Sequence, residues 1–245
     1  MTQPQICSGH DSHRPFRLER RAMLVKVNFG QTERHGNYVL NHSDGVMRIR
    51  DKKAMKILFD QAGVLHPAWS DTEVPDVECV LKSNTHRKGT MCKVTKKMKI
   101  DFEKYYVEEF IPFEREFRVH VSFLRPIFST EKILRRNHST WIRNLDSCTF
   151  KVEFEKPEGW DNMIKDCQWI LHTADLDFAG FDIGYADGRF YFIEANTACG
   201  MGDKTRAAYT EELNRLTMLK QSTYCYTKTK KENEILLSAL RVGNL

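Results

Sequence analysis

The sequence predicts an α+β protein in which helices and strands pack in layers. Strand-like and helix-like segments follow one another without the strict alternation of βαβ units, which favours this class. Apolar residues recur at helical spacing between Trp160 and Ala174, and two strand-like runs flank the hairpin signal Asp187-Gly188. With 245 residues the chain can form one sizeable domain or two closely packed lobes.

The composition is that of a soluble globular protein, with 41% hydrophobic and 29% charged residues. The net charge of +5 suits an anionic small molecule such as a nucleotide at least as well as a nucleic acid. Seven cysteines without a Cys-x-x-Cys pair favour reduced thiols and a cytoplasmic location over a disulfide scaffold or a zinc site. No apolar run approaches the length of a membrane span, so we expect no membrane association.

In chain order, we expect a loose polar arm over residues 1–19, a strand over 21–27 and a loop as far as Asp44. Residues 51–63 predict a helix, because Asp51 is a good N-cap and Gly63 can end it. The apolar stripe expected for this helix consists of Ala54, Leu58 and Ala62, with Ile57 beside them.

Short apolar runs predict the strands that follow, over residues 79–82, 91–94, 105–111, 116–123, 127–134, 149–154, 181–185 and 189–195. The apolar periodicity from Trp160 to Ala174 predicts a helix between the strands over 149–154 and 181–185. After Met201 the chain is expected to be mostly helical, over residues 206–219 and 232–240.

Three hard oxygen ligands, Asp182, Glu194 and Asn196, lie in the hairpin around Asp187-Gly188. A two-residue turn would place Asp182 and Glu194 on opposite faces, whereas a three-residue loop or a bulge would place them on the same face. We predict the three-residue loop, because a shared face makes a magnesium site. The alternative is a hairpin whose acids face solvent.

Other polar groups each have a functional and an ordinary interpretation. Lys82 ends a strand before a loop that ends at Gly89, and it can hold phosphates or be a surface lysine. Acids at residues 108–109 and Glu116 can bind adenine or ribose, or pair with arginines across the strands. The basic stretches 93–99 and 135–144 can contact anions, nucleic acid included, or be solvated loops.

In this order, the segments resemble ATP-grasp enzymes of the RimK-type carboxylate–amine ligase branch. Asp51-Lys52 opens the helix before Gly63-Val64-Leu65-His66-Pro67 and is similar to the family's first helix segment, and Lys82 to Gly89 is similar to its phosphate lysine and flexible loop. The adenine hinge, the E-x-R-V strand and the R-x-N loop of the family resemble Glu108-Glu109-Phe110-Ile111, Glu116 with Arg118, and Arg143-Asn144. Its metal hairpin resembles Ala179-Gly180-Phe181-Asp182 through Glu194-Ala195-Asn196, spacing included.

The resemblance implies the ATP-grasp fold, in which two α+β lobes clasp a nucleotide, here with a reduced N-terminal lobe. The expected domains are an arm and reduced segment over 1–50, an ATP-grasp core over 51–205, and a helical extension over 206–245. Within the core, the small lobe would cover about 51–107 and the large lobe about 108–205. The chain departs from the family after Asn196, where Ala198-Cys199-Gly200 replaces the common Ser-Pro-Gly.

The activity implied is ATP-dependent amide or peptide bond formation through an acylphosphate. Its cofactors would be ATP and one or two Mg²⁺, with Mn²⁺ as a substitute, and its partners small-molecule or peptide carboxylates and amines. Metal would bind Asp182, Glu194 and Asn196; ATP would bind Lys52, Lys82, Gly89, Glu108, Glu109, Phe110, Ile111 and Glu116; and Arg118, Arg143 and Asn144 would be catalytic.

Two alternatives stay open at this point: a phosphotransferase on the same fold, and a non-catalytic nucleotide- or nucleic-acid-binding protein. Steeply salt-dependent oligonucleotide binding without ATP turnover would indicate the second. Small stand-alone proteins of this kind also resemble ATP-grasp proteins of tailed bacteriophages, which would place the chain in a host cytoplasm.

Overall fold

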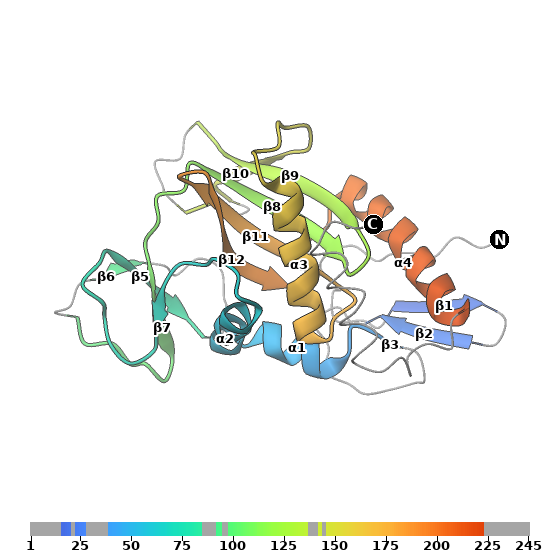
Figure 1. The fold of residues 1–245 in the computed structure, drawn as a ribbon, viewed down its shortest axis with the longest axis horizontal. Helices are drawn as coiled ribbons and strands as arrows, with labels where there is room; N and C mark the ends of the chain where they lie inside the picture. The colour runs from blue at the N-terminus through green and yellow to red at the C-terminus, as the bar shows by residue number, and fades with distance from the viewer. Residues whose placement is uncertain are drawn as a thin grey trace.

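The computed structural model describes residues 16–20, 23–27, 39–84, 92–94, 98–136, 142–143 and 146–222. Their strands form a five-stranded, a four-stranded and a three-stranded sheet. Figure 1 shows helix α3 (Trp160–Ala174) in front of the central five-stranded sheet, with the four-stranded sheet at one end of the long axis and the three-stranded sheet at the other. No helix among these residues is long and apolar enough to cross a membrane.

The five-stranded sheet is antiparallel throughout and has the order β10-β9-β8-β11-β12. Its strands are β8 (Arg115–Ser122), β9 (Pro126–Leu134), β10 (Cys148–Lys151), β11 (Phe178–Ala186) and β12 (Arg189–Asn196). Alternate residues such as Phe117 and Phe181 pack with α3 in the main core. The residues between them, Glu116, Arg118 and Asp182 among them, point to the opposite face, which we call the polar face.

The four-stranded sheet has the order β4-β7-β5-β6. Its strands are β4 (Trp69–Ser70), β5 (Cys79–Ser83), β6 (Cys92–Val94) and β7 (Tyr105–Glu109). One face carries a small apolar cluster around Cys79, Val94 and Val107. Lys82 and Glu108 alternate with those residues and therefore lie on the other face.

Two consecutive helices, α1 (Ser43–Arg50) and α2 (Lys52–Ala62), precede the small sheet. The predicted ends of α2 are confirmed: the Asp51 side chain accepts from two backbone N–H groups, and Gly63 closes the helix at φ 64°. Its predicted stripe is wrong in part, because Ile57 is 48% exposed while Met55 and Phe59 are buried. The expected loop before Asp44 contains the strand β3 (Val39–Leu40), and α1 begins one residue before Asp44 and was not expected.

Asn41, directly after β3, joins this part of the chain to the start of β11. Its side-chain oxygen accepts from the backbone N–H groups of Asp177 and Phe178 at 2.9 and 3.0 Å. Its side-chain nitrogen donates to the Phe178 carbonyl at 3.0 Å, and its own backbone N–H donates to the Asp177 carboxylate at 2.6 Å. A single buried side chain therefore fixes strands that lie 137 residues apart in sequence.

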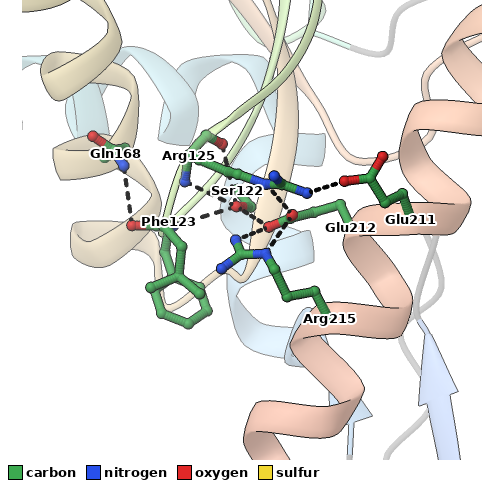
Figure 2. Close-up of polar contacts among 8 residues, drawn as sticks. Ser122, Phe123, Arg125, Gln168, Glu211, Glu212 and Arg215 are labelled. Carbon is green, nitrogen blue, oxygen red and sulfur yellow. Dashed lines mark hydrogen bonds and ion pairs between the residues drawn. The ribbon is translucent and has the colours of Figure 1, made fainter.

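Helix α4 (Asp203–Ser222) covers one end of the polar face through a buried carboxylate, as Figure 2 shows. Glu212 is 1% exposed; it accepts from the Ser122 hydroxyl at 2.5 Å and from the Arg125 guanidinium at 2.6 Å. Arg215, one turn further along α4, donates to the same carboxylate at 2.6 and 2.9 Å. Beside this network Tyr209 packs on Phe178 of β11.

Most predicted elements are confirmed, with shifts at their ends. The helix from Trp160 to Ala174 matches its expected bounds, while β10 ends at Lys151 instead of residue 154. The strand expected over 21–27 is confirmed as β2 (Met23–Val27), whereas β1 (Phe16–Arg20) lies mostly in the stretch that we expected to be a loose arm, so that prediction is wrong there. The expected helix over 232–240 lies outside the described residues.

Gly45 allows α1 to approach the end of α3 closely. A Cβ at this position would lie 2.4 Å from the Ala174 carbonyl oxygen and 2.9 Å from that of Asp175. In an open helix position, Gly→Ala stabilises by about 1 kcal/mol. We predict that Gly45→Ala instead lowers the free energy of unfolding by about 1–3 kcal/mol, measured by urea denaturation, because backbone atoms must move.

Gly200→Ala is the matched control, because a Cβ there meets nothing within 4 Å. Unchanged or raised stability in Gly45→Ala would contradict the close packing of α1 on α3.

Candidate functional site

The β11–β12 hairpin has a two-residue turn, so the predicted three-residue loop is wrong. Ala186 pairs with Arg189, and both turn residues have positive φ, 50° at Asp187 and 73° at Gly188. Asp-Gly suits the mirror-image turns that match the twist of a hairpin. A regular ladder continuing from this turn would place Asp182 opposite Ile193 and Glu194 on the other face.

A β-bulge at Ile193 prevents that outcome. The register shifts between Asp182 and Ile183, so that Ile183 pairs with Phe192 but Asp182 pairs with Glu194. Asn196 follows two residues later, opposite Gly180. The three predicted metal ligands therefore share the polar face, by the bulge that was the alternative to the three-residue loop.

Asp182 is buried and held by two cations. Both of its oxygens accept from Arg118, each at 2.8 Å, and the Lys132 ammonium lies 3.1 Å away. Burial raises the pKa of this carboxyl, but Arg118 and Lys132 outweigh it, so the pKa of Asp182 lies well below its usual range. Because Asp182 is only 7% exposed, the alternative of a solvent-facing acid does not apply to it.

Glu116 lies beside Asp182 on the same face, near the same lysine. The Lys132 ammonium is 3.5 Å from its carboxylate, and the Arg143 guanidinium is 3.9 Å away. Burial raises the pKa of Glu116, against the opposing effect of Lys132 and Arg143. Arg143 also donates to the Phe113 carbonyl at 3.1 Å, so its position is fixed by the chain between the two sheets.

Two lysines one turn apart on α2 connect β12 to the small sheet. Lys52 pairs with Glu194, and Lys56 donates to the Ile193 carbonyl at 3.0 Å while pairing with Glu108. The other oxygen of Glu108 pairs with Lys82 of β5. Burial raises the pKa of Glu108, but the two lysines outweigh it and lower that pKa.

Burial acts on Lys56 in the opposite direction to its partner. It lowers the pKa of Lys56 to about 8, although Glu108 works against this. Glu194 and Glu108 both lie near Lys56, and Lys82 adds a second positive charge close by.

The predicted adenine hinge lies where the chain leaves the small sheet. The backbone N–H groups of Glu109 and Phe110 already donate, to the Ala68 and Glu78 carbonyls, each at 2.7 Å. Glu108 is 1% exposed, and its carboxylate is committed to the two lysines. These N–H groups and the Glu108 carboxylate are therefore already used within the protein. Adenine binding at the hinge would depend on its carbonyl groups and on the segment around Ile111.

Close packing limits the polar face at both ends. Near Glu116, the Phe113 ring lies on Gly184, where a Cβ would come within 2.4 Å of the ring. At the other end, a Cβ on Gly180 would lie 2.3 Å from the Cys199 sulfur and 3.0 Å from the His120 ring. Both glycines are needed for these contacts, and the ion pairs of Asp182 and Glu194 lie between them.

At the α4 end, His120 is buried and Cys199 is half-buried. His120 is in hydrogen-bond contact with the Tyr209 hydroxyl at 3.0 Å. Burial raises the pKa of the Cys199 thiol to about 12, so this thiol is neutral and not a poised nucleophile.

The oxygen donors fit a hard divalent cation. Two carboxylates and one amide on a common face are the ligand types that Mg²⁺ takes. Arg118 pairs with the Asp182 carboxylate and Lys52 with the Glu194 carboxylate. Each carboxylate oxygen has two lone pairs, so these pairs leave lone pairs that a metal ion could use. Within the described residues no group of three His, Cys, Asp or Glu side chains could hold a metal ion.

The structure therefore brings together eight of the predicted side chains: Lys52, Lys82, Glu108, Glu116, Arg118, Arg143, Asp182 and Glu194. Gly89 and Asn144 lie outside the described residues. Sequence reasoning missed Lys56 and Lys132. Each had a signal: Lys56 is four residues after Lys52, and Lys132 alternates with Thr130 on β9 opposite Glu116.

Solved structures of ligases are similar to this fold. D-alanine–D-alanine ligase from Bacillus anthracis, complexed with ATP, matches with a TM-score of 0.55 and 16% identity over 79% of this chain and 71% of that one. The ATP-grasp ligase PsnB, complexed with its minimal precursor, has the same TM-score and identity over 74% and 64% of the two chains. The macrocyclase MdnC from Microcystis aeruginosa, bound to the precursor peptide MdnA, gives 0.53 and 15% over 74% and 65%.

This chain has the ATP-grasp fold. It spans less than two thirds of PsnB and MdnC. No protein-family model matches the sequence, and the comparison with curated proteins found no match. Since identity to the solved structures is low, they establish the fold alone.

The site of this ATP-grasp fold carries an excess of positive charge. Its described ion pairs contain six cationic side chains, Lys52, Lys56, Lys82, Arg118, Lys132 and Arg143, and four carboxylates, Glu108, Glu116, Asp182 and Glu194. The formal excess of two positive charges attracts an anion such as a nucleotide phosphate.

His120 gives the site a pH dependence of known sign. Burial and then Arg118 lower its pKa from 6.5 to about 3. Between pH 6.5 and about 3, His120 is protonated in the unfolded chain but neutral in the folded protein. The free energy of unfolding therefore falls as the pH drops through this range. We predict that the unfolding free energy falls by about 2 kcal/mol between about pH 7 and about pH 5 through this group.

Urea denaturation at the two pH values measures this loss, and in His120→Asn it should shrink by that amount. Equal pH dependence in the variant and the wild type would show that His120 does not carry it.

Proposed function

We propose that this protein is an ATP-dependent carboxylate–amine ligase that forms an amide or peptide bond through an acylphosphate. The observation that carries the proposal is the polar face of the ATP-grasp fold. There, the carboxylates Asp182 and Glu194 lie opposite each other, Asn196 follows, and cationic side chains surround them. Oxygen ligands and cations on one surface are what a magnesium nucleotide requires.

The similar solved structures support this class of substrate. One is a ligase named for joining D-alanine to D-alanine, and two are complexed with precursors, one of them a precursor peptide. By analogy, the acid and the amine here would be small molecules or peptide side chains. The RimK-type branch and the phage link rest on the motif order of the sequence, and a cytoplasmic location on its cysteine usage.

Each residue of the site has a proposed role in holding the nucleotide. Adenine would bind at residues 108–111 and ribose at Glu116, while Lys52 and Lys82 would contact the phosphates, with the loop ending at Gly89 closing over them. Asp182, Glu194 and Asn196 would hold Mg²⁺ or Mn²⁺. When bound, the metal supplies charge neutralisation at the phosphates.

The chemistry then needs no protein nucleophile. Phosphoryl transfer depends mainly on positioning and charge stabilisation. Arg118 and Lys132 lie against Asp182, and Arg143 lies near Glu116. In this proposal all three would stabilise negative charge on the acylphosphate. Asn144 would assist from the adjoining loop. The substrate carboxylate would take the γ-phosphoryl group of ATP as ADP leaves. The amine would then attack the acyl carbon, phosphate would leave, and the amine would lose a proton.

Asp182→Asn tests the metal assignment. In wild-type protein, Mg²⁺ with a non-hydrolysable ATP analogue at about 100 times its Kd should add about 3 kcal/mol of stability, seen as a rise in melting temperature. In Asp182→Asn we predict that the magnesium-dependent part of this rise is lost, and that ADP release with any productive acid and amine pair falls by about 100-fold or more.

Glu131→Gln is the matched control. It also removes a buried carboxylate paired with an arginine, Arg115, but it lies on the α3 side of the sheet. A folded Asp182→Asn protein with a normal magnesium-dependent shift would refute the metal site. ADP release that never depends on an amine would favour a phosphotransferase, and salt-dependent oligonucleotide binding without turnover would favour a nucleic-acid-binding protein.

A further inference from the structure

Lys56 is a completely buried lysine in an apolar setting. Its side chain is 0% exposed, and its neighbours on α2, Met55 and Phe59, are equally buried in the main core. Burying an ammonium group is unfavourable unless partners compensate, so a lysine here indicates a need for its donors. Those donors go to two groups on different sheets: the Glu108 carboxylate on the small sheet and the Ile193 carbonyl on the large one.

The Ile193 carbonyl belongs to the bulged residue of β12. In the ladder, Ile183 pairs with Phe192 and Asp182 with Glu194, so Ile193 is skipped. A bulged residue lacks the regular ladder partner that would hold it. At 3.0 Å, the Lys56 ammonium takes that place from the helix side.

The bulge decides whether the two carboxylates meet. Without it, the ladder from the turn would pair Asp182 with Ile193, and Glu194 would move to the face that packs on α3. The second partner of Lys56, Glu108, also holds Lys82 through its other carboxylate oxygen. The ammonium group of Lys56 thus contacts both the β11–β12 hairpin, at Ile193, and the Glu108 carboxylate, which pairs with Lys82.

We propose that Lys56 is a positioning residue: by holding the bulge at Ile193 and the carboxylate of Glu108, it keeps Glu194 opposite Asp182 and Lys82 beside them. The proposal rests on the function proposed above. It concerns a residue that would touch neither the nucleotide nor the metal. Partners that orient metal ligands from behind commonly contribute about 10–100-fold to metal affinity.

The test compares Lys56→Met with Lys53→Met, the same substitution on the same helix. Lys53 donates to the Phe102 carbonyl at 2.7 Å and pairs with Asp71 at 3.1 Å, so it also ties α2 to the small sheet but touches no group of the polar face. Mn²⁺ affinity is measured by electron paramagnetic resonance without nucleotide, and the melting temperature is recorded for each protein. We predict that Lys56→Met weakens Mn²⁺ binding about tenfold or more, whereas Lys53→Met leaves it unchanged.

Deleting Ile193 separates positioning from general stability. Without this residue the strand needs no bulge, because Glu194 then directly follows Phe192 and still falls opposite Asp182. In that background Lys56→Met should cost little further Mn²⁺ affinity, so the two changes are strongly non-additive. If Lys56→Met alone does not fold, Mn²⁺ affinity is compared between the Ile193 deletion and the double variant that combines the deletion with Lys56→Met.

Equal losses of Mn²⁺ affinity in both backgrounds, or no loss in either, would overturn the positioning role while leaving the proposed function untouched. Wild-type protein that binds Mn²⁺ with the predicted dependence on Lys56, but releases no ADP with any acid and amine, would remove the ligase and keep the positioning role. Wild-type protein that binds neither Mn²⁺ nor the ATP analogue would overturn both.

Discussion

Carboxylates buried on one face of a sheet require cations beside them, and this requirement determines how the site is built. Asp182 of β11 is held by Arg118 of β8, Glu194 of β12 by Lys52 of α2, and Glu108 of β7 by a second lysine of α2. In every pair the two charges come from different elements. The contacts that neutralise the acids are therefore also the contacts that join the large sheet, α2 and the small sheet.

This arrangement gives the protein a site that is charged but ordered before any ligand arrives. The low pKa of Asp182 keeps this carboxylate ionised at neutral pH. The arginines and lysines beside the acids are held by the same pairs, and this is the preorganisation that the proposed phosphoryl transfer would require. Removing one of these carboxylates would lower the stability of the fold, because it would leave a buried positive charge without its partner.

The sequence predicted the fold through the order of its motifs. It also predicted a common face for Asp182, Glu194 and Asn196, but through a three-residue loop and not through the bulge that produces it. Local signals succeeded where one residue decides the geometry, as at Asp51 and Gly63, the two caps of α2. They failed where distant packing decides. The bulge at Ile193 has no signature of its own, and a lysine such as Lys56 in a helix ordinarily faces solvent. Gly45 lowers the helix propensity of α1, so local signals argue against this helix. Only the close contact with the end of α3 explains why a glycine stands there.

The position of β8 has a consequence for the chain as it leaves the ribosome. β8 lies in the middle of the large sheet, yet its neighbour β11 begins 56 residues after β8 ends, counting from Ser122 to Phe178. Until that strand is synthesised, one edge of β8 has no partner and could pair with another chain. Its alternation places Glu116 and Arg118 on one face of this open strand, and charged side chains on an edge strand oppose aggregation. The charges that serve the finished site would then also protect the nascent protein.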